Sequence, residues 1–144
     1  MRRSKKNERG STLVEFAIGA TVFLSAMFGV LEFGRALWVH NALADAARRG
    51  ARYAVINSQD EGKVKNMVVY GSPGGGGKPL VDNLGVGNVI VDYSNFEMNR
   101  GTVSVTIENY QFQFVLPFLG TSITMPGYTT TLTGESAGRT PTDK

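Results

Sequence analysis

The most constraining feature of the sequence is an uncharged apolar run close to the N-terminus. Residues 16–31 are 16 consecutive positions without a charged side chain, and residues 11–14 extend the apolar stretch to 21 residues, interrupted only by Glu15. A helix of that length spans roughly 30 Å, which is the thickness of the hydrocarbon core of a bilayer. We therefore expect a membrane-inserted helix that is transmembrane from about residue 12 to residue 33.

The positive charge of the chain is concentrated just before this run. The sequence holds 15 basic and 12 acidic residues, a formal net charge of +3, and its first ten residues alone hold five basic and one acidic side chain, or +4. The rest of the chain therefore carries −1, so it offers no basic face and nucleic-acid binding is not expected. Under the positive-inside rule, the basic leader (residues 1–10) stays in the cytoplasm and the remaining chain is directed outward.

The composition argues against most enzyme chemistry. The sequence has no cysteine, which excludes disulfides, thiolate catalysis and Cys-ligated metal centres. His40 is its single histidine, so the chain cannot form a multi-His metal site or a Ser-His-Asp triad by itself. We expect no enzymatic activity, no cofactor, no metal site and no small-molecule substrate.

Two ordinary explanations of the apolar run each leave a feature unexplained. A secretory signal peptide requires a small-residue cleavage site soon after its apolar core, but the Ala-rich residues 42–47 lie more than ten positions beyond the run. A permanent signal anchor explains the hydropathy but not the acid at position 15. A carboxylate inside a membrane segment costs ~2.5–3.5 kcal/mol on insertion scales, so Glu15 needs a reason.

A third interpretation supplies that reason. Residues 9–16, RGSTLVEF, resemble the cleavage region of type IV prepilins, in which a dedicated peptidase cuts after glycine and leaves glutamate as the fifth mature residue. The resemblance implies a cut between Gly10 and Ser11, which makes Glu15 the fifth residue. Glu15 then lies one helical turn from the new ammonium group of Ser11 and can neutralise it, or that of a neighbouring subunit, in a low dielectric. The alternative is a carboxylate that merely sits at the headgroup boundary.

The helical pattern continues beyond the membrane segment, to about residue 57. Residues 32–55 are Ala-rich and contain no proline, which favours helix. Small residues recur at every fourth position in two stripes, a pattern that lets helix backbones approach closely. The first stripe has little local sequence to pack against and indicates a partner helix, whereas the second more plausibly packs against the chain's own C-terminal region. The first stripe is Ala17, Thr21, Ser25 and Gly29, and the second is Ala42, Ala46, Gly50 and Ala54.

The polar side chains of this helix indicate structural roles. Glu32 and Arg35 are spaced to form an ion pair near the outer membrane edge. A solvated helix face explains the basic cluster next to Asp45 better than an anion site does, and His40 is assigned no chemistry. The basic cluster consists of Arg48, Arg49 and Arg52.

The region after the helix is predicted to be a Gly-rich loop region (58–85) followed by a β-rich outer domain (86–135) and a disordered tail (136–144). The glycines at 71–77 resemble a phosphate-binding loop, but Ser72 and Pro79 stand where that motif requires Gly and Ser or Thr around Lys78. The acids at 60, 61, 92 and 97 fall in predicted turns and lack a catalytic constellation. Aromatic side chains of this region are expected in the core, namely Tyr93, Phe96, Tyr110, Phe112 and Phe114.

Alternating residues predict a small antiparallel sheet. Val103, Val105 and Ile107 share one face of the clearest strand, which spans 102–109. Three or four strands with one apolar face need a cover, and helix 42–55 is available. The fold class is therefore α+β: a long N-terminal membrane-inserted helix with a pilin-like antiparallel sheet packed on its distal half. The other expected strands are 88–94, 111–115, where Pro117 ends the pattern, and 127–134, and a turn is expected at 98–101.

Three segments together resemble the TadE-like (TadE/TadG) family of minor pilins, or pseudopilins, of bacterial tight-adherence (Tad) pilus systems. They are GSTLVEFA (10–17), EFGR (32–35) and AARRGARYA (46–54), and the segments at 103–110 and 114–120 are similar to the family's strand and Leu-Pro segments. The resemblance implies an inner-membrane protein with its C-terminal domain outside, and a place at the cell surface in the pilus. Implied partners are a prepilin peptidase, the Tad secretion ATPase and inner-membrane platform, the major pilin and other TadE-like subunits. The alternatives are a single-pass signal-anchored envelope protein without a filament role, and a secreted binding module that begins near residue 47.

Overall fold

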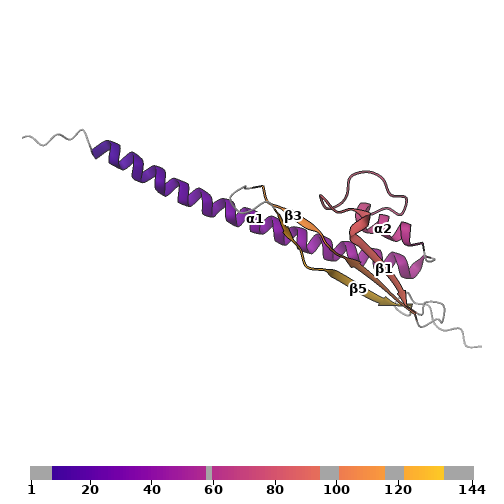
Figure 1. Ribbon diagram of the computed structural model, residues 1–144. Helices are drawn as coiled ribbons and strands as arrows, with labels where there is room; N and C mark the ends of the chain where they lie inside the picture. Colours follow the sequence, from indigo (N-terminus) through magenta and orange to yellow (C-terminus); the bar gives the residue numbers. More distant parts are fainter. Residues whose placement is uncertain (1–7, 58–59, 95–100, 116–121, 135–144) are drawn as a thin grey trace, which may run out of the picture.

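The protein is built around one long helix that carries a small domain on its C-terminal half (Figure 1). The computed structural model describes residues 8–57, 60–94, 101–115 and 122–134. A long helix followed by an antiparallel sheet confirms the expected α+β class. The elements are α1 (Glu8–Ile56), α2 (Glu61–Tyr70), a short 3₁₀ helix η1 (Val86–Asn88), β1 (Val89–Ser94), β2 (Thr102–Ile107), β3 (Gln111–Gln113), β4 (Ser122–Thr124) and β5 (Tyr128–Thr133).

The main sheet has the order β1-β2-β5, with both pairs antiparallel. Strand β2 alternates as predicted, because Val103, Val105 and Ile107 are fully buried on the face that packs against α1. Its other face carries hydroxyl side chains, and the Thr106 and Thr129 hydroxyl oxygens lie 2.9 Å apart across the strand pair. The sheet is therefore apolar on the side that α1 covers and polar on the other.

Strands β3 and β4 form a separate two-stranded sheet, which differs from the single sheet expected. Phe112 of β3 lies opposite Ile123 of β4 and is buried in the core, as predicted for that aromatic. Strand β4 was not predicted, because three residues are too short to show a period. The expected turn positions 98–100, Phe96, Glu97, Pro117 and the tail 136–144 lie outside the described residues.

Helix α2 lies within the segment that was expected to be a Gly-rich loop. Asp60 is its N-cap, and the Asp60 carboxylate accepts a hydrogen bond of 3.1 Å from the backbone N–H of Lys63. Hydrogen bonds from the side chain and then the backbone of Lys63 hold the pKa of the Asp60 carboxyl below its ordinary value. Asp60 and Glu61 therefore begin a helix, and Asp92 lies within strand β1, so the prediction that these three acids fall in turns is wrong. The glycine-rich loop starts only at Gly71, the left-handed C-cap with φ 73°.

The second stripe of small residues packs into the core of the domain, as expected. Ala46, Gly50 and Ala54 are buried and Ala42 is half-buried. A Cβ atom placed on Gly50 would collide with the Val68 side chain of α2 and would lie 3.4 Å from the Val105 Cγ1 atom. Glycine at position 50 therefore lets α1 approach both α2 and the sheet.

We expect Gly50→Ala to destabilise the domain by about 1–3 kcal/mol, because the added methyl group overpacks this contact. The measurement is the thermal unfolding midpoint of the full chain in detergent. Gly34→Ala is the matched control, since a Cβ at Gly34 meets no atom within 4 Å. The double variant Gly50→Ala/Val68→Ala should lose less stability than the two single changes combined. Equal destabilisation by Gly50→Ala and Gly34→Ala would contradict the packing explanation.

Candidate membrane and assembly interface

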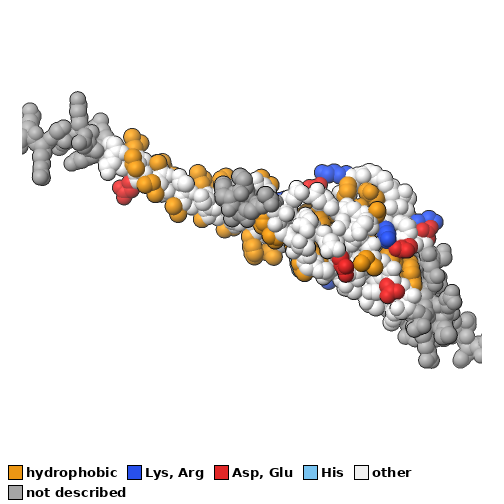
Figure 2. All heavy atoms as spheres, viewed as in Figure 1, with side chains coloured by type: hydrophobic (Ala, Val, Ile, Leu, Met, Phe, Trp, Pro, Cys, Tyr) orange, Lys and Arg blue, Asp and Glu red, His pale blue; other side chains and the backbone are white. Residues whose placement is uncertain are grey.

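The first half of α1 projects from the domain and exposes apolar side chains (Figure 2). Within the described part of the chain, Gly10–Ile56 is the one helical segment that is long and apolar enough to cross a membrane. The most apolar part of this segment is not buried by the protein itself. An exposed apolar surface of this size in water would be costly, so the helix is suited to a lipid environment. Its most exposed large side chains include Leu13, Phe16, Ile18, Val22, Phe23 and Val30.

The residues of the predicted cleavage site lie at the very start of α1. Gly10 and Ser11 fall among the first four helical residues, whose backbone N–H groups have no partner within a helix. A Cβ atom on Gly10 would meet no atom within 4 Å, so a side chain could be accommodated at this position. Glu15 is exposed one helical turn after Ser11, in the position that the proposed charge neutralisation requires.

The first small-residue stripe forms an open face of the projecting helix. The Thr21 hydroxyl donates a hydrogen bond of 2.8 Å to the Ala17 carbonyl, and the Ser25 hydroxyl donates one of 2.8 Å to the Thr21 carbonyl. Both hydroxyl groups are thus satisfied within the helix, which makes them tolerable in lipid. A Cβ on Gly29 would also meet no atom within 4 Å. A partner helix could therefore pack against this stripe without having to supply hydrogen-bond partners for the Thr21 and Ser25 hydroxyls.

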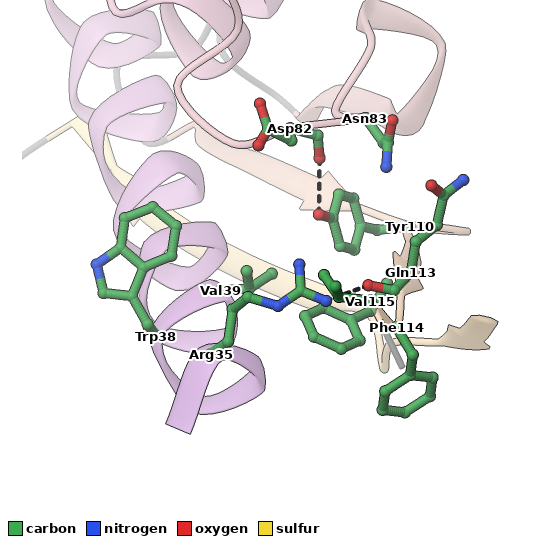
Figure 3. A pocket seen from close by; sticks show the side chains of 10 residues that line it. Arg35, Trp38, Val39, Asp82, Asn83, Tyr110, Gln113, Phe114 and Val115 are labelled. Atoms are coloured by element: carbon green, nitrogen blue, oxygen red, sulfur yellow. Dashed lines mark hydrogen bonds between the residues drawn. The ribbon is translucent and has the colours of Figure 1, made fainter. Parts of the chain in front are cut away.

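Glu32 and Arg35 form the predicted ion pair, which also fastens strand β3 to α1. Glu32 is only 7% exposed, and its carboxylate lies 2.9 Å from the Arg35 guanidinium. Its second oxygen accepts a hydrogen bond of 3.2 Å from the backbone N–H of Val115. Arg35 in turn donates a hydrogen bond to the Gln113 carbonyl (Figure 3). Its guanidinium carbon also lies 4.4 Å from the centre of the Phe112 ring. The pairing was predictable from spacing, but its role as a link to β3 was not.

His40, Asp45 and Arg48 of the distal helix form structural contacts. The Nδ1 atom of His40 lies 2.8 Å from the Tyr128 hydroxyl. Burial raises the pKa of Tyr128 above its ordinary value. Arg48 and Asp45 form the exposed pair expected on a solvated helix face, at 3.1 Å. These groups have no arrangement that would support acid–base catalysis.

A cavity of about 460 Å³ lies beside Arg35, and both the Arg35 guanidinium and the Tyr110 hydroxyl in its wall are paired (Figure 3). The Tyr110 hydroxyl donates a hydrogen bond of 2.7 Å to the Asp82 carbonyl, and burial raises the pKa of Tyr110. Arg35 is held by Glu32 and Gln113. Across the described ranges, no group of three or more His, Asp or Glu side chains is placed to hold a metal ion.

The glycine-rich loop does not have the context of a phosphate-binding loop. It follows helix α2, whereas such a loop follows a strand. Lys78 forms an exposed ion pair with Asp82 at 3.3 Å, in place of reaching into a cradle of backbone N–H groups. The position of the loop after a helix therefore differs from that of a phosphate-binding loop, as its sequence also does.

The comparison with protein families found a match, and this match lies within α1. Residues 10–52 match the TadE-like protein family. The match begins at the glycine of the predicted cleavage site and covers the projecting helix, the Glu32–Arg35 pair and most of the buried half of α1. No curated protein and no solved structure matches the chain. The match covers less than half of the chain and likens α1 to a family associated with Tad pili, and the exposed apolar helix is consistent with a membrane anchor.

We expect Arg35→Met to loosen β3 from the TadE-like helix and to cost about 1–3 kcal/mol, because it leaves the buried Glu32 carboxylate without its cation. Amide hydrogen exchange should accelerate at Val115, which donates to Glu32. Arg48→Met is the control, since it breaks another i,i+3 pair of α1 that is exposed on both sides and worth at most ~1 kcal/mol. The same exchange rate at Val115 in both variants would refute the link.

Proposed function

We propose that this protein is a minor pilin, or pseudopilin, of a tight-adherence pilus, with a structural role in pilus assembly, priming or adhesion. The observation that carries the proposal is the match to the TadE-like family from Gly10 onward, where a glycine, Glu15 and an exposed apolar helix follow one another. A prepilin peptidase would cut between Gly10 and Ser11. The mature protein would then begin with the apolar helix itself.

The charge at position 15 has a physical role in this scheme. Cleavage creates an ammonium group at Ser11, and an unpaired charge at that depth is costly in the low dielectric of a membrane or a filament core. The Glu15 carboxylate neutralises this ammonium or that of the next subunit. An ordinary membrane anchor gains nothing from an acid at this position, so Glu15 favours the pilin over the signal-anchored alternative.

The open face of α1 provides the contact with other subunits. In the membrane its stripe of small residues would meet lipid or another TadE-like subunit, and in the pilus it would meet the helix of the major pilin. The secretion ATPase and the inner-membrane platform would supply the work of extraction. Before assembly the protein is a single-pass protein of the inner membrane with its domain outside, and after assembly it lies at the cell surface.

The first test is the processing of the leader. We expect the protein from native membranes and from the sheared surface fraction to begin at Ser11, as measured by intact mass and N-terminal residue. Gly10→Leu should abolish processing, because the added side chain occupies the position that the peptidase reads. Gly19→Leu introduces the same side chain at another open position of α1 and should be processed normally. A chain that still begins at Met1 and stays in membranes would leave a plain signal anchor.

The second test concerns the charge of Glu15. We expect Glu15→Gln and Glu15→Leu to insert in the membrane and yet enter the sheared fraction at least about tenfold less, since a loss of ~1.4 kcal/mol in assembly is already tenfold. Glu15→Asp should restore part of the level, and Val14→Leu should have no effect. The measurement is complementation of a deletion strain, with membrane and sheared fractions quantified separately. Wild-type piliation with Glu15→Leu would exclude the neutralising role.

A further inference from the structure

The β3–β4 hairpin has one polar face and one apolar face. In its register Gln111 lies opposite Thr124 and Gln113 lies opposite Ser122, so four polar side chains share a face. Phe112 and Ile123 lie opposite each other on the other face. The sequence from 109 to 134 contains no charged residue at all, although charged residues are 19% of the chain. Such a hairpin can lie at a boundary between water and an apolar medium.

The apolar face of the hairpin lies next to the part of α1 that follows the predicted membrane segment. A groove of about 440 Å³ lies between them, and its walls are almost entirely apolar. Phe33 is 66% exposed and Ile123 is 45% exposed, so both remain accessible from outside. The apolar walls consist mainly of Phe33, Ala36 and Leu37 of α1 together with Phe114, Ile123 and Met125.

The position of this groove along α1 places it at the level of the lipid headgroups. Exposed large apolar side chains follow α1 from Leu13 to Trp38, a length of roughly 38 Å at the helical rise. The hydrocarbon core is ~30 Å thick and the whole bilayer with its interfacial regions ~40–45 Å, so Trp38 falls in an interfacial layer. Tryptophan is enriched at that level. The groove, lined by α1 residues from Gly29 to His40, lies at the same height.

The charges near the groove do not prevent contact with lipid. The Glu32 carboxylate at its edge is buried and paired with Arg35, so it presents little charge to the surroundings. His40, which also lines the groove, is bonded to the Tyr128 hydroxyl. The exposed ion pairs lie farther along the molecule, at Asp45–Arg48 and on α2 and the loop after it. Figure 2 shows the same separation, with charged side chains gathered over the distal part of the domain.

We propose that the β3–β4 hairpin is a second membrane contact of this protein: it lies in the interfacial layer beside α1, and lipid acyl chains fill the groove between them. The inference rests on membrane insertion of α1, which is part of the proposed function, but not on leader cleavage or on entry into a pilus. Two membrane contacts, α1 and the hairpin, fix the tilt and rotation of the domain relative to the bilayer. With α1 as the sole contact, the protein could rotate about the axis of this helix. The polar face of the hairpin then meets water.

The depth of Trp38 tests the height of the groove without any substitution, because Trp38 is the only tryptophan of the chain. The full chain is reconstituted in phosphatidylcholine–phosphatidylglycerol vesicles that contain a quencher either near the headgroup or deep in the acyl chains. We expect the shallow quencher to be severalfold more effective than the deep one. Stronger quenching by the deep quencher, or the same weak quenching by both, would overturn the assigned depth.

A matched pair of labels then tests the hairpin itself, since the chain has no cysteine of its own. A nitroxide is attached to Ile123→Cys on the apolar face and to its neighbour Ser122→Cys on the polar face, and collision rates with oxygen and with a water-soluble nickel chelate are measured. The ratio of oxygen to nickel collisions should be severalfold higher at Ile123→Cys. Val22→Cys, on the exposed apolar helix, gives the reference for lipid.

The outcomes separate this inference from the proposed function. A lipid-like ratio at Val22→Cys together with a water-like ratio at Ile123→Cys would refute the hairpin contact and leave insertion of α1 standing. Water-like ratios at both positions would refute insertion as well. The nitroxide at Ile123→Cys could instead be immobile, with a spectrum broadened by a second nitroxide nearby. Loss of this broadening on dilution with unlabelled chain would assign the groove to a second copy of the protein and overturn the lipid contact.

Discussion

The ion pair between the buried Glu32 and the exposed Arg35 marks the point at which helix α1 changes its surroundings. Before it, α1 presents apolar side chains outward and is covered by no other part of the described chain; after it, small residues of α1 form the core of a folded domain. The pair hides a carboxylate that would otherwise stand at the membrane edge, and through Val115 and Gln113 it holds β3 against the helix. The pair thus ties the end of β3 to α1, beside the main packing of α1 against α2, β2 and β5.

Much of the fold could be predicted because its strongest signals are local. The length of α1 follows from an apolar run and an Ala-rich continuation, and β2 follows from strict alternation of Val103, Val105 and Ile107 with hydroxyl side chains. The ion pair of Glu32 and Arg35 follows from helical spacing. In each case neighbours in the sequence determine the structure.

The features that sequence reasoning missed depend on distant partners or on short signals. Helix α2 is ten residues long, and its markers were Asp60 as N-cap, buried Val64 and Val68 one turn apart, and Gly71 as C-cap. The composition of the glycine-rich segment that follows concealed them. The separate β3–β4 sheet and the Arg35–Gln113 contact join residues far apart in the chain, and no local pattern specifies such pairings. The candidate site residues Gly10, Ser11 and Glu15 were found through family resemblance and charge, which a fold alone does not supply.

The dimensions of the protein explain why half of α1 must have another cover. At 49 residues α1 is roughly 74 Å long, whereas the six-residue strands of the main sheet span only about 20 Å. A domain of this size can bury the distal part of the helix and no more. The projecting part needs an apolar cover, and lipid and helices of other subunits both provide one. Because the Thr21 and Ser25 hydroxyls are satisfied by their own helix, the same surface can pass from lipid to a neighbouring helix without losing a hydrogen bond. The proposed function, in which the helix leaves the membrane and enters a pilus, would require this self-sufficiency.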